Sequence, residues 1–187
     1  PHKSFVSKNL VPISGGLIFT ISALLFLRFE NKLIYVIFLI FFVGILSDLN
    51  TLKSPYKRFF LQLSAILSLV FLYKIFISSI IITFCLLILI NGSNFIDGVN
   101  TSLIGYFLSV ILIILILVNN YNLNFETQNL KIIFSVLLIF FVFNFFEKFF
   151  CGDSGSYIIS LIVGYYLVEL SNLDLFISPY FIACLLW

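Results

Sequence analysis

The polar residues best suited to chemistry lie in one stretch, Asn91-Gly92-Ser93-Asn94-Phe95-Ile96-Asp97-Gly98-Val99-Asn100, with long runs of Leu, Ile, Phe and Val on both sides. Asn, Gly and Asp favour helix ends and turns, so we expect one apolar helix to end here and another to begin. If the first helix continues, the spacing places Asn91, Asn94 and Asp97 on one ridge. Their oxygens suit a hard cation such as Mg²⁺ together with an anionic substrate. A turn rich in amides is the alternative.

A second polar cluster, Cys151-Gly152-Asp153-Ser154-Gly155-Ser156, opens another apolar run. A helix N-terminus favours anions, and glycine lets a ligand approach the backbone closely. Asp153 would repel a phosphate at such a position unless a divalent ion bridged the two groups. We therefore expect a metal bridge at Asp153, with simple helix capping as the alternative.

The chain that carries these clusters is too apolar for a water-soluble protein. Of its 187 residues, 62% are hydrophobic and 10% are charged, and the mean hydropathy is +1.22. This amount of charge can fill loops between spans but cannot cover a water-facing surface, and the apolar runs lack the alternation of a β-barrel. We predict an all-α fold, a polytopic integral membrane helical bundle with about seven complete spans and a truncated eighth. We expect residues 1–187 to form a single domain that is cut at both ends, because the chain begins with Pro1 and stops at Trp187 within an apolar run.

The order of the spans predicts where the acidic residues lie. An eighth span starts after Pro179, and the others are expected at roughly 17–29, 33–46, 59–77, 80–90, 102–118, 132–146 and 157–170. The fourth is short for a bilayer core of ~30 Å, so either it continues through the Asn residues or the membrane thins there. Asp48, Asp97 and Asp153 follow the second, fourth and sixth spans, so two crossings separate each from the next. All three carboxylates should therefore face one side of the membrane.

The distribution of basic residues indicates that this side is cytoplasmic. The opposite face carries four basic residues, and the acidic face carries six, which are Lys3, Lys8, Lys53, Lys57, Arg58 and Lys148. Lys8 could contact phosphate. Lys53, Lys57 and Arg58 could neutralise a diphosphate, although the inside-positive bias is the slightly favoured explanation of Lys57 and Arg58. We expect Cys151, beside Asp153, to react with a membrane-impermeant thiol reagent from the cytoplasmic side only.

Taken together, the clusters closely resemble the polyprenyl-phosphate N-acetylhexosamine-1-phosphate transferases. This superfamily includes phospho-N-acetylmuramoyl-pentapeptide transferase and the enzymes that start O-antigen, enterobacterial common antigen and teichoic acid assembly, and the chain looks more like this initiating branch. The resembling residues run from end to end in the expected order: Lys8 with Pro12-Ile13-Ser14-Gly15-Gly16, then Gly44-Ile45-Leu46-Ser47-Asp48, then Asn91 to Asn100, then Phe150-Cys151-Gly152-Asp153-Ser154-Gly155-Ser156.

The resemblance implies a transfer that depends on Mg²⁺, with Mn²⁺ as the alternative ion, at the cytoplasmic face of a bacterial inner (plasma) membrane. A sugar 1-phosphate would pass from a UDP-N-acetylhexosamine to undecaprenyl phosphate, a polyprenyl phosphate lipid, and UMP would leave. By analogy Asn94 and Asp153 ligate the metal, Asp97 lies beside the nucleotide diphosphate, and Asp48 orients or deprotonates the lipid phosphate. The residues expected to bind substrate are Lys8, Lys53, Asn91, Asn94 and Asn100.

The sequence also departs from this family. Ser47 stands where the family usually has a first Asp, and Asn100-Thr101 replaces an acidic residue and a glycine. The family's His-containing loop would lie beyond Trp187. A non-catalytic relative is therefore one alternative. A membrane transporter is another, although the acids lie at span ends on one face and no inverted repeat is seen. Membrane lipids are expected partners, nucleic acid is not, and a homodimer is an open alternative to a monomer.

Overall fold

The computed structural model describes residues 15–27, 29–73, 79–97, 101–123 and 125–171, and within these ranges the regular secondary structure is all α-helix. The described helices are α1 (Gly15–Phe26), α2 (Asn31–Asp48), α3 (Pro55–Leu72), α4 (Ser79–Ile96), α5 (Ser102–Asn120), α6 (Gln128–Phe145) and α7 (Gly152–Ser171). Four of them, α2, α5, α6 and α7, are long and apolar enough to cross a membrane, whereas α1 and the stretch Ile80–Ile96 of α4 are apolar but fall below that length. The all-α fold is confirmed, and these apolar helices support a membrane protein. The expected eighth span lies outside the described residues, so the count of spans stays a prediction.

Helix α4 decides between the two explanations of the short fourth span. It does not stop at Ile90 but continues through Asn91 and Asn94 to Ile96. With 18 residues and a rise of ~1.5 Å per residue, it is about 27 Å long, close to the thickness of a bilayer core. The amide side chains therefore lie on the last turns of an apolar helix.

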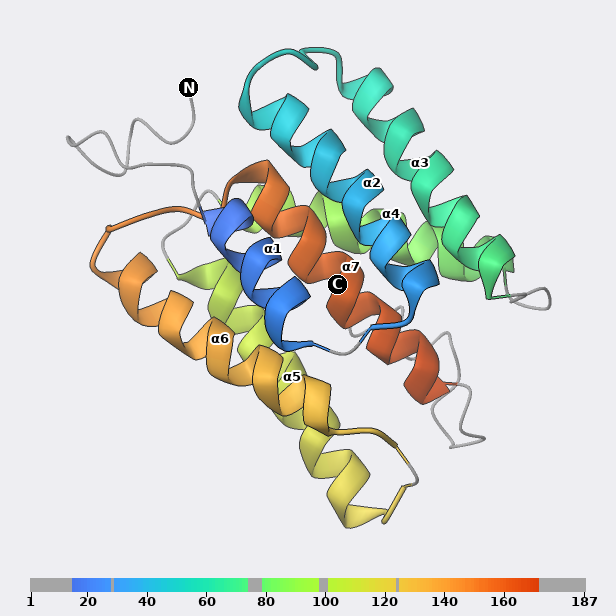
Figure 1. Ribbon diagram of the computed structural model, residues 1–187, viewed down its shortest axis with the longest axis vertical. Helices are drawn as coiled ribbons and strands as arrows, with labels where there is room; N and C mark the ends of the chain where they lie inside the picture. Colours follow the sequence, from blue (N-terminus) through green and yellow to red (C-terminus); the bar gives the residue numbers. More distant parts are fainter. Residues whose placement is uncertain (1–14, 28, 74–78, 98–100, 124, 172–187) are drawn as a thin grey trace.

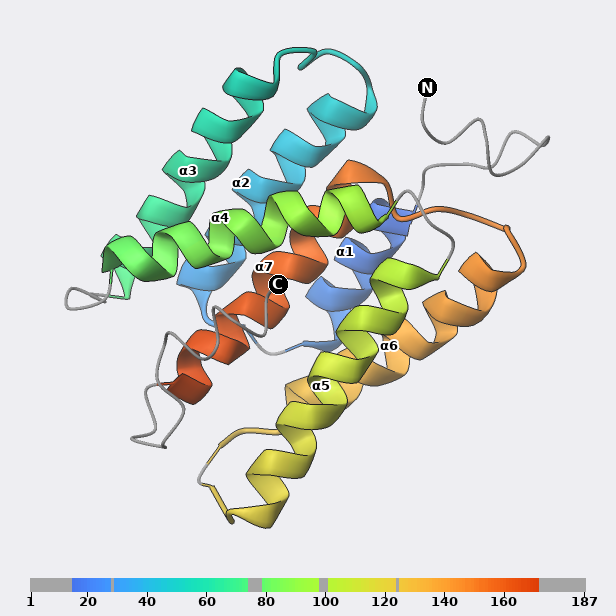
Figure 2. The same cartoon turned by 180° about the vertical axis from the view of Figure 1, so that it is seen from behind.

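Helix α7 is the centre of the bundle. Within its span-length window 89% of the residues are buried, against 33–39% in α2, α5 and α6. Figures 1 and 2 show α1 and α2 on one side of α7 and α4 and α5 on the other, with α3 beside α2 and α6 beside α5. The first turn of α7 is therefore enclosed by several other helices.

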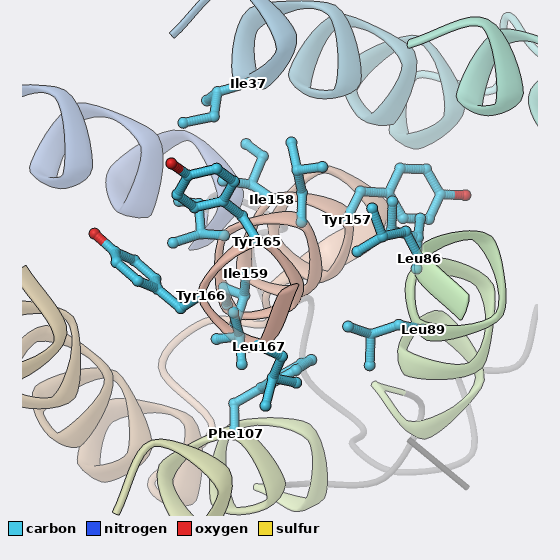
Figure 3. Packing of buried hydrophobic residues seen from close by; sticks show 14 of the residues in the cluster. Ile37, Leu86, Leu89, Phe107, Tyr157, Ile158, Ile159, Tyr165, Tyr166 and Leu167 are labelled. Carbon is cyan, nitrogen blue, oxygen red and sulfur yellow. The ribbon is translucent and has the colours of Figure 1, made fainter. Parts of the chain in front are cut away.

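The side chains of α7 fit this central position, because apolar or small residues lie on all sides of the helix. Figure 3 shows Ile158, Ile159 and Leu167 pointing in different directions from the α7 axis, toward residues of the surrounding helices such as Ile37 of α2 and Phe107 of α5. All five of these side chains are buried. Such packing on every side fixes the position of the polar residues at the start of α7.

Glycines let two helices approach the start of α7 very closely. A Cβ atom on Gly16 of α1 would lie 2.2 Å from Ser154 Oγ, and one on Gly44 of α2 would lie 2.3 Å from Ser154 Cα. The N–H groups of Gly15 and Gly16 donate to the carbonyls of Phe150 and Cys151 at 3.1 and 3.0 Å, which satisfies two donors at the start of α1. The Gly15-Gly16 pair therefore docks α1 on the segment that leads into α7.

This docking corrects one sequence-based prediction. Cys151 is fully buried in the structure, with a relative exposure of 0%, because α1 covers it. An impermeant thiol reagent is not expected to reach it from either side, so the prediction that Cys151 reacts from the cytoplasm is wrong.

Candidate active site

Two of the three predicted polar stretches meet directly at the start of α7. The carboxylate of Asp48, the last residue of α2, accepts hydrogen bonds from the backbone N–H groups of Asp153 and Ser154 at 2.8 and 3.1 Å. It also accepts from the hydroxyl of Ser154 at 2.6 Å. A carboxylate in this position satisfies free N–H groups and is stabilised by the helix dipole. Asp48 therefore caps α7 from a neighbouring helix, and the prediction that Asp48 and Asp153 share one face is confirmed.

The Asp153 side chain contacts two other groups. The hydroxyl of Ser47 donates to Asp153 Oδ2, and the guanidinium of Arg58 forms an ion pair with the same oxygen at 3.1 Å. The same guanidinium nitrogen donates to Ser47 Oγ at 2.9 Å. Asp153, Ser47 and Arg58 thus form a cluster that joins the first turns of α7 and α3 to the end of α2.

Arg58 lies in the site, although the inside-positive bias was the slightly favoured explanation of this residue in the sequence. The signal that favours a site role is the short connection between α2 and α3. Asn50 adopts a positive φ of 57°, a conformation that Asn tolerates, and Pro55 begins α3 without needing an N–H partner. The chain turns back at once, so Arg58 in the first turn of α3 lies over Ser47.

The third predicted polar stretch, at the end of α4, contacts the start of α7 through buried serines. Ser156 Oγ donates to Asn94 Oδ1 at 3.4 Å, and Ser160 Oγ donates to Ser93 Oγ at 2.5 Å. Ser93, Ser156 and Ser160 have relative exposures of 0–2%, so these contacts attach the last turns of α4 to the first turns of α7. Asn94 is therefore held one turn along α7 from Asp153. Ser93 and Ser156 belong to the predicted polar stretches, whereas Ser160, within an apolar run, gave no sequence signal for this contact.

The remaining predicted site residues are not described in contact with Asp48 or Asp153. Asn91 Nδ2 donates to Gln62 Oε1 at 2.9 Å and to the carbonyl of Leu87 at 2.8 Å, so Asn91 faces α3 whereas Asn94 faces α7. Asp97 follows the end of α4 and is buried, with 5% exposure. Lys53 is exposed in the connection between α2 and α3. Lys8 and Asn100 lie outside the described residues.

Comparison with known proteins identifies the family of the chain. The model of the family described as "Glycosyl transferase family 4" matches residues 31–171, which include helices α2 to α7. The chain belongs to glycosyl transferase family 4. This membership agrees with the resemblance to the polyprenyl-phosphate hexosamine-1-phosphate transferases, and it supports a sugar-phosphate transferase role for a membrane protein. No curated protein and no solved structure matches the chain.

The donor atoms of this family 4 glycosyl transferase fit the predicted divalent ion. Mg²⁺ in phosphate-binding sites is usually held by one or two carboxylates, while substrate phosphates and water complete its shell. Within the described ranges no group of three or more His, Cys, Asp and Glu side chains is arranged to hold a metal. Asp153 and Asn94 supply a carboxylate and an amide oxygen, and Arg58 and Ser47 contact Oδ2 of Asp153. The site therefore fits an ion shared with the substrate, which Asp153 and Asn94 would hold.

The contacts of Asp48 give a test of its capping role. Asp48→Ala leaves the first N–H groups of α7 without their acceptor, so we expect a loss of about 1–3 kcal/mol in the free energy of unfolding. Asp48→Asn keeps an acceptor oxygen and should lose less than half of that. Thermal unfolding of the purified variants in detergent measures the difference. If the alanine variant unfolds like the wild type, Asp48 does not support α7.

Proposed function

We propose that the protein transfers an N-acetylhexosamine 1-phosphate from a UDP-sugar to a polyprenyl phosphate such as undecaprenyl phosphate, with release of UMP. A phosphate oxygen of the lipid attacks the β-phosphorus of the UDP-sugar, and the bond from that phosphorus to the bridging oxygen breaks, so that the bridging oxygen leaves on UMP. The observation that carries the proposal is the gathering of Asp48, Asp153, Asn94 and Arg58 at the start of α7 in a family 4 glycosyl transferase.

The chemistry of phosphoryl transfer explains why such a cluster is sufficient. Catalysis depends mainly on positioning and on neutralising the charge of the phosphate oxygens. We propose that Asp153 and Asn94 hold Mg²⁺, or Mn²⁺ in its place, which when bound supplies this neutralisation. Asp48 orients the reacting groups through the first turn of α7, and buried Asp97 lies beside the nucleotide diphosphate. Lys8, Lys53, Asn91 and Asn100 are proposed to contact substrate.

An apolar groove between α3 and α4 supports a lipid acceptor. Its volume is about 730 Å³, and its lining includes Phe59, Leu63 and Leu67 of α3 and Ile80, Thr83 and Leu87 of α4. One end of the groove adjoins the site, because Phe59 follows Arg58 and the carbonyl of Leu87 accepts from Asn91. A polyprenyl chain in this groove would have its phosphate near the start of α7.

Filling the groove should weaken lipid binding selectively. Leu67 is 49% exposed, and Leu67→Trp would occupy space that the chain of the lipid needs. We expect the KM for polyprenyl phosphate to rise about tenfold, equal to about 1.4 kcal/mol, with the KM for the UDP-sugar unchanged. Leu138→Trp is the matched control, because Leu138 is similarly exposed (46%) but lies on α6. Equal effects of both variants, or no effect of Leu67→Trp, would argue against this groove.

The distribution of basic residues supports a site on the cytoplasmic side of a bacterial inner membrane, where UDP-sugars are made. Transfer there would initiate a lipid-linked surface glycan such as O-antigen or teichoic acid. The direct test measures UMP with the complete protein, a panel of UDP-N-acetylhexosamines and undecaprenyl phosphate. We expect UMP release that needs both substrates and a divalent ion. Flux of a substrate across vesicles without UMP release would instead indicate a transporter.

A further inference from the structure

We infer that Arg58 is an exchangeable partner of Asp153: it pairs with this carboxylate while the site lacks a divalent ion, and it turns to a phosphate oxygen of the nucleotide diphosphate when ion and nucleotide bind together. The inference rests on the proposed function and goes beyond it, because it assigns a substrate-binding role to a residue that neither the motifs nor the family match identifies.

The first observation is the geometry of the pair. Arg58 is bound to Asp153 Oδ2 at 3.1 Å, and the two side chains are 27% and 19% exposed. Charge-assisted hydrogen bonds in such partly buried sites are stronger than ordinary ones. Asp153 is also the carboxylate proposed to hold the metal. Arg58 and the divalent ion would therefore share the carboxylate of Asp153. Each cation must then weaken the attraction of this carboxylate for the other.

The second observation is that the contacts of Arg58 are incomplete. Its Nε atom and the Nε2 atom of Gln62 are buried, and neither has a hydrogen-bond partner among the described residues. The two residues are four apart on α3, which places them on the same face of the helix. A guanidinium carries five donors in a planar fork that suits phosphate. Gln62 is fully buried and bound to Asn91 of α4, so the unused Nε donor of the partly exposed Arg58 is the group that points to an oxygen-rich ligand.

These observations predict effects of opposite sign on two ligands. Without nucleotide, the positive charge of Arg58 opposes a divalent ion at Asp153. With a diphosphate present, the added negative charge attracts the guanidinium, so Arg58 then favours the complex. A residue that only supports the fold would weaken binding of both ligands together when it is replaced.

The experiment uses Mn²⁺ alone and UDP as probes of the purified complete protein in detergent. Arg58→Gln removes the charge, so we expect Mn²⁺ without nucleotide to bind about five- to tenfold more tightly, read from the electron paramagnetic resonance of free Mn²⁺. We expect UDP, titrated at saturating Mn²⁺, to bind about tenfold or more weakly, as for loss of a hydrogen bond to a charged group. Lys57→Gln is the matched control, because Lys57 is the exposed neighbour on the same helix turn, and it should change neither constant beyond about twofold.

If the Arg58→Gln variant fails to fold, Arg58→Lys provides a second test with the same measurements. A lysine keeps the charge but not the planar fork. We therefore expect Mn²⁺ to bind more tightly and UDP to bind more weakly, each by only about two- to threefold. Unchanged or weaker Mn²⁺ binding in these variants overturns the inference while leaving the proposed function intact, provided that the wild type binds Mn²⁺ and releases UMP. If the wild type neither binds Mn²⁺ nor releases UMP, the proposed function itself is wrong.

Discussion

Asp153→Asn is expected to lower the rate of UMP release by at least about 100-fold, the usual effect of removing a group that stabilises charge at a reacting centre. The amide keeps the size of the side chain but loses the negative charge that the divalent ion needs. Arg58 loses its ionic partner in the same change. The rate is measured with saturating UDP-sugar, polyprenyl phosphate and Mg²⁺.

The fold should survive this substitution. The backbone N–H of Asp153, not its side chain, donates to Asp48, so the cap of α7 remains. Glu126→Gln is the matched control, since Glu126 is exposed in the connection between α5 and α6, away from the start of α7, and should keep wild-type activity. UMP release by Asp153→Asn at the wild-type rate would remove Asp153 from the metal site.

Gly44→Ala is expected to have the largest effect on stability. A Cβ atom there would lie 2.3 Å from the Cα atom of Ser154 and 2.8 Å from its nitrogen, and backbone atoms cannot yield as the end of a flexible side chain can. Separating α2 from α7 would also stretch the hydrogen bonds from α7 to Asp48. We expect the free energy of unfolding to fall by about 3 kcal/mol or more, which is at or above the upper end of the usual cost of overpacking. It is measured in detergent and in membranes.

Gly105→Ala is the control for the general effect of replacing a helical glycine. A Cβ atom on Gly105 of α5 would lie 3.5 Å from Phe141 Cε2, an ordinary contact, and alanine is the better helix former. This variant should be as stable as the wild type or slightly more so. If Gly44→Ala and Gly105→Ala unfold alike, α2 and α7 do not pack as closely as described.

The sequence alone was enough to predict what depends on local composition. Long apolar runs predicted the helices. Counting spans predicted that Asp48 and Asp153 lie on the same side, because an even number of crossings returns a chain to the side from which it started. The polar cluster at Gly152 marked the opening of α7, but the predicted spans at 17–29 and 59–77 placed α1 and α3 too late, since these helices begin at Gly15 and Pro55. The end of α4 was left open, since helix propensity near Asn91 is weak and packing against α7 decides it.

What the sequence could not show depends on contacts between distant elements. Arg58 looks like any loop-flanking cation until the turn after Asp48 brings it back over Ser47. Ser160 looks like an occasional polar residue in an apolar helix, and its contact with Ser93 is found only when α4 and α7 are packed together. Similarly, the capping of α7 by Asp48 needs the relative placement of two helices, which no local pattern encodes.

The most direct test of the account follows the β-phosphorus of the sugar nucleotide. The complete protein is given UDP-N-acetylhexosamine labelled with ³²P at the β-phosphate and with ³H in the sugar, together with undecaprenyl phosphate and Mg²⁺. Transfer of a sugar 1-phosphate predicts both labels in the lipid in equal amounts and unlabelled UMP in the water. Lipid that carries ³H without ³²P, with labelled UDP left in the water, would show transfer of the sugar alone and would contradict the proposed reaction.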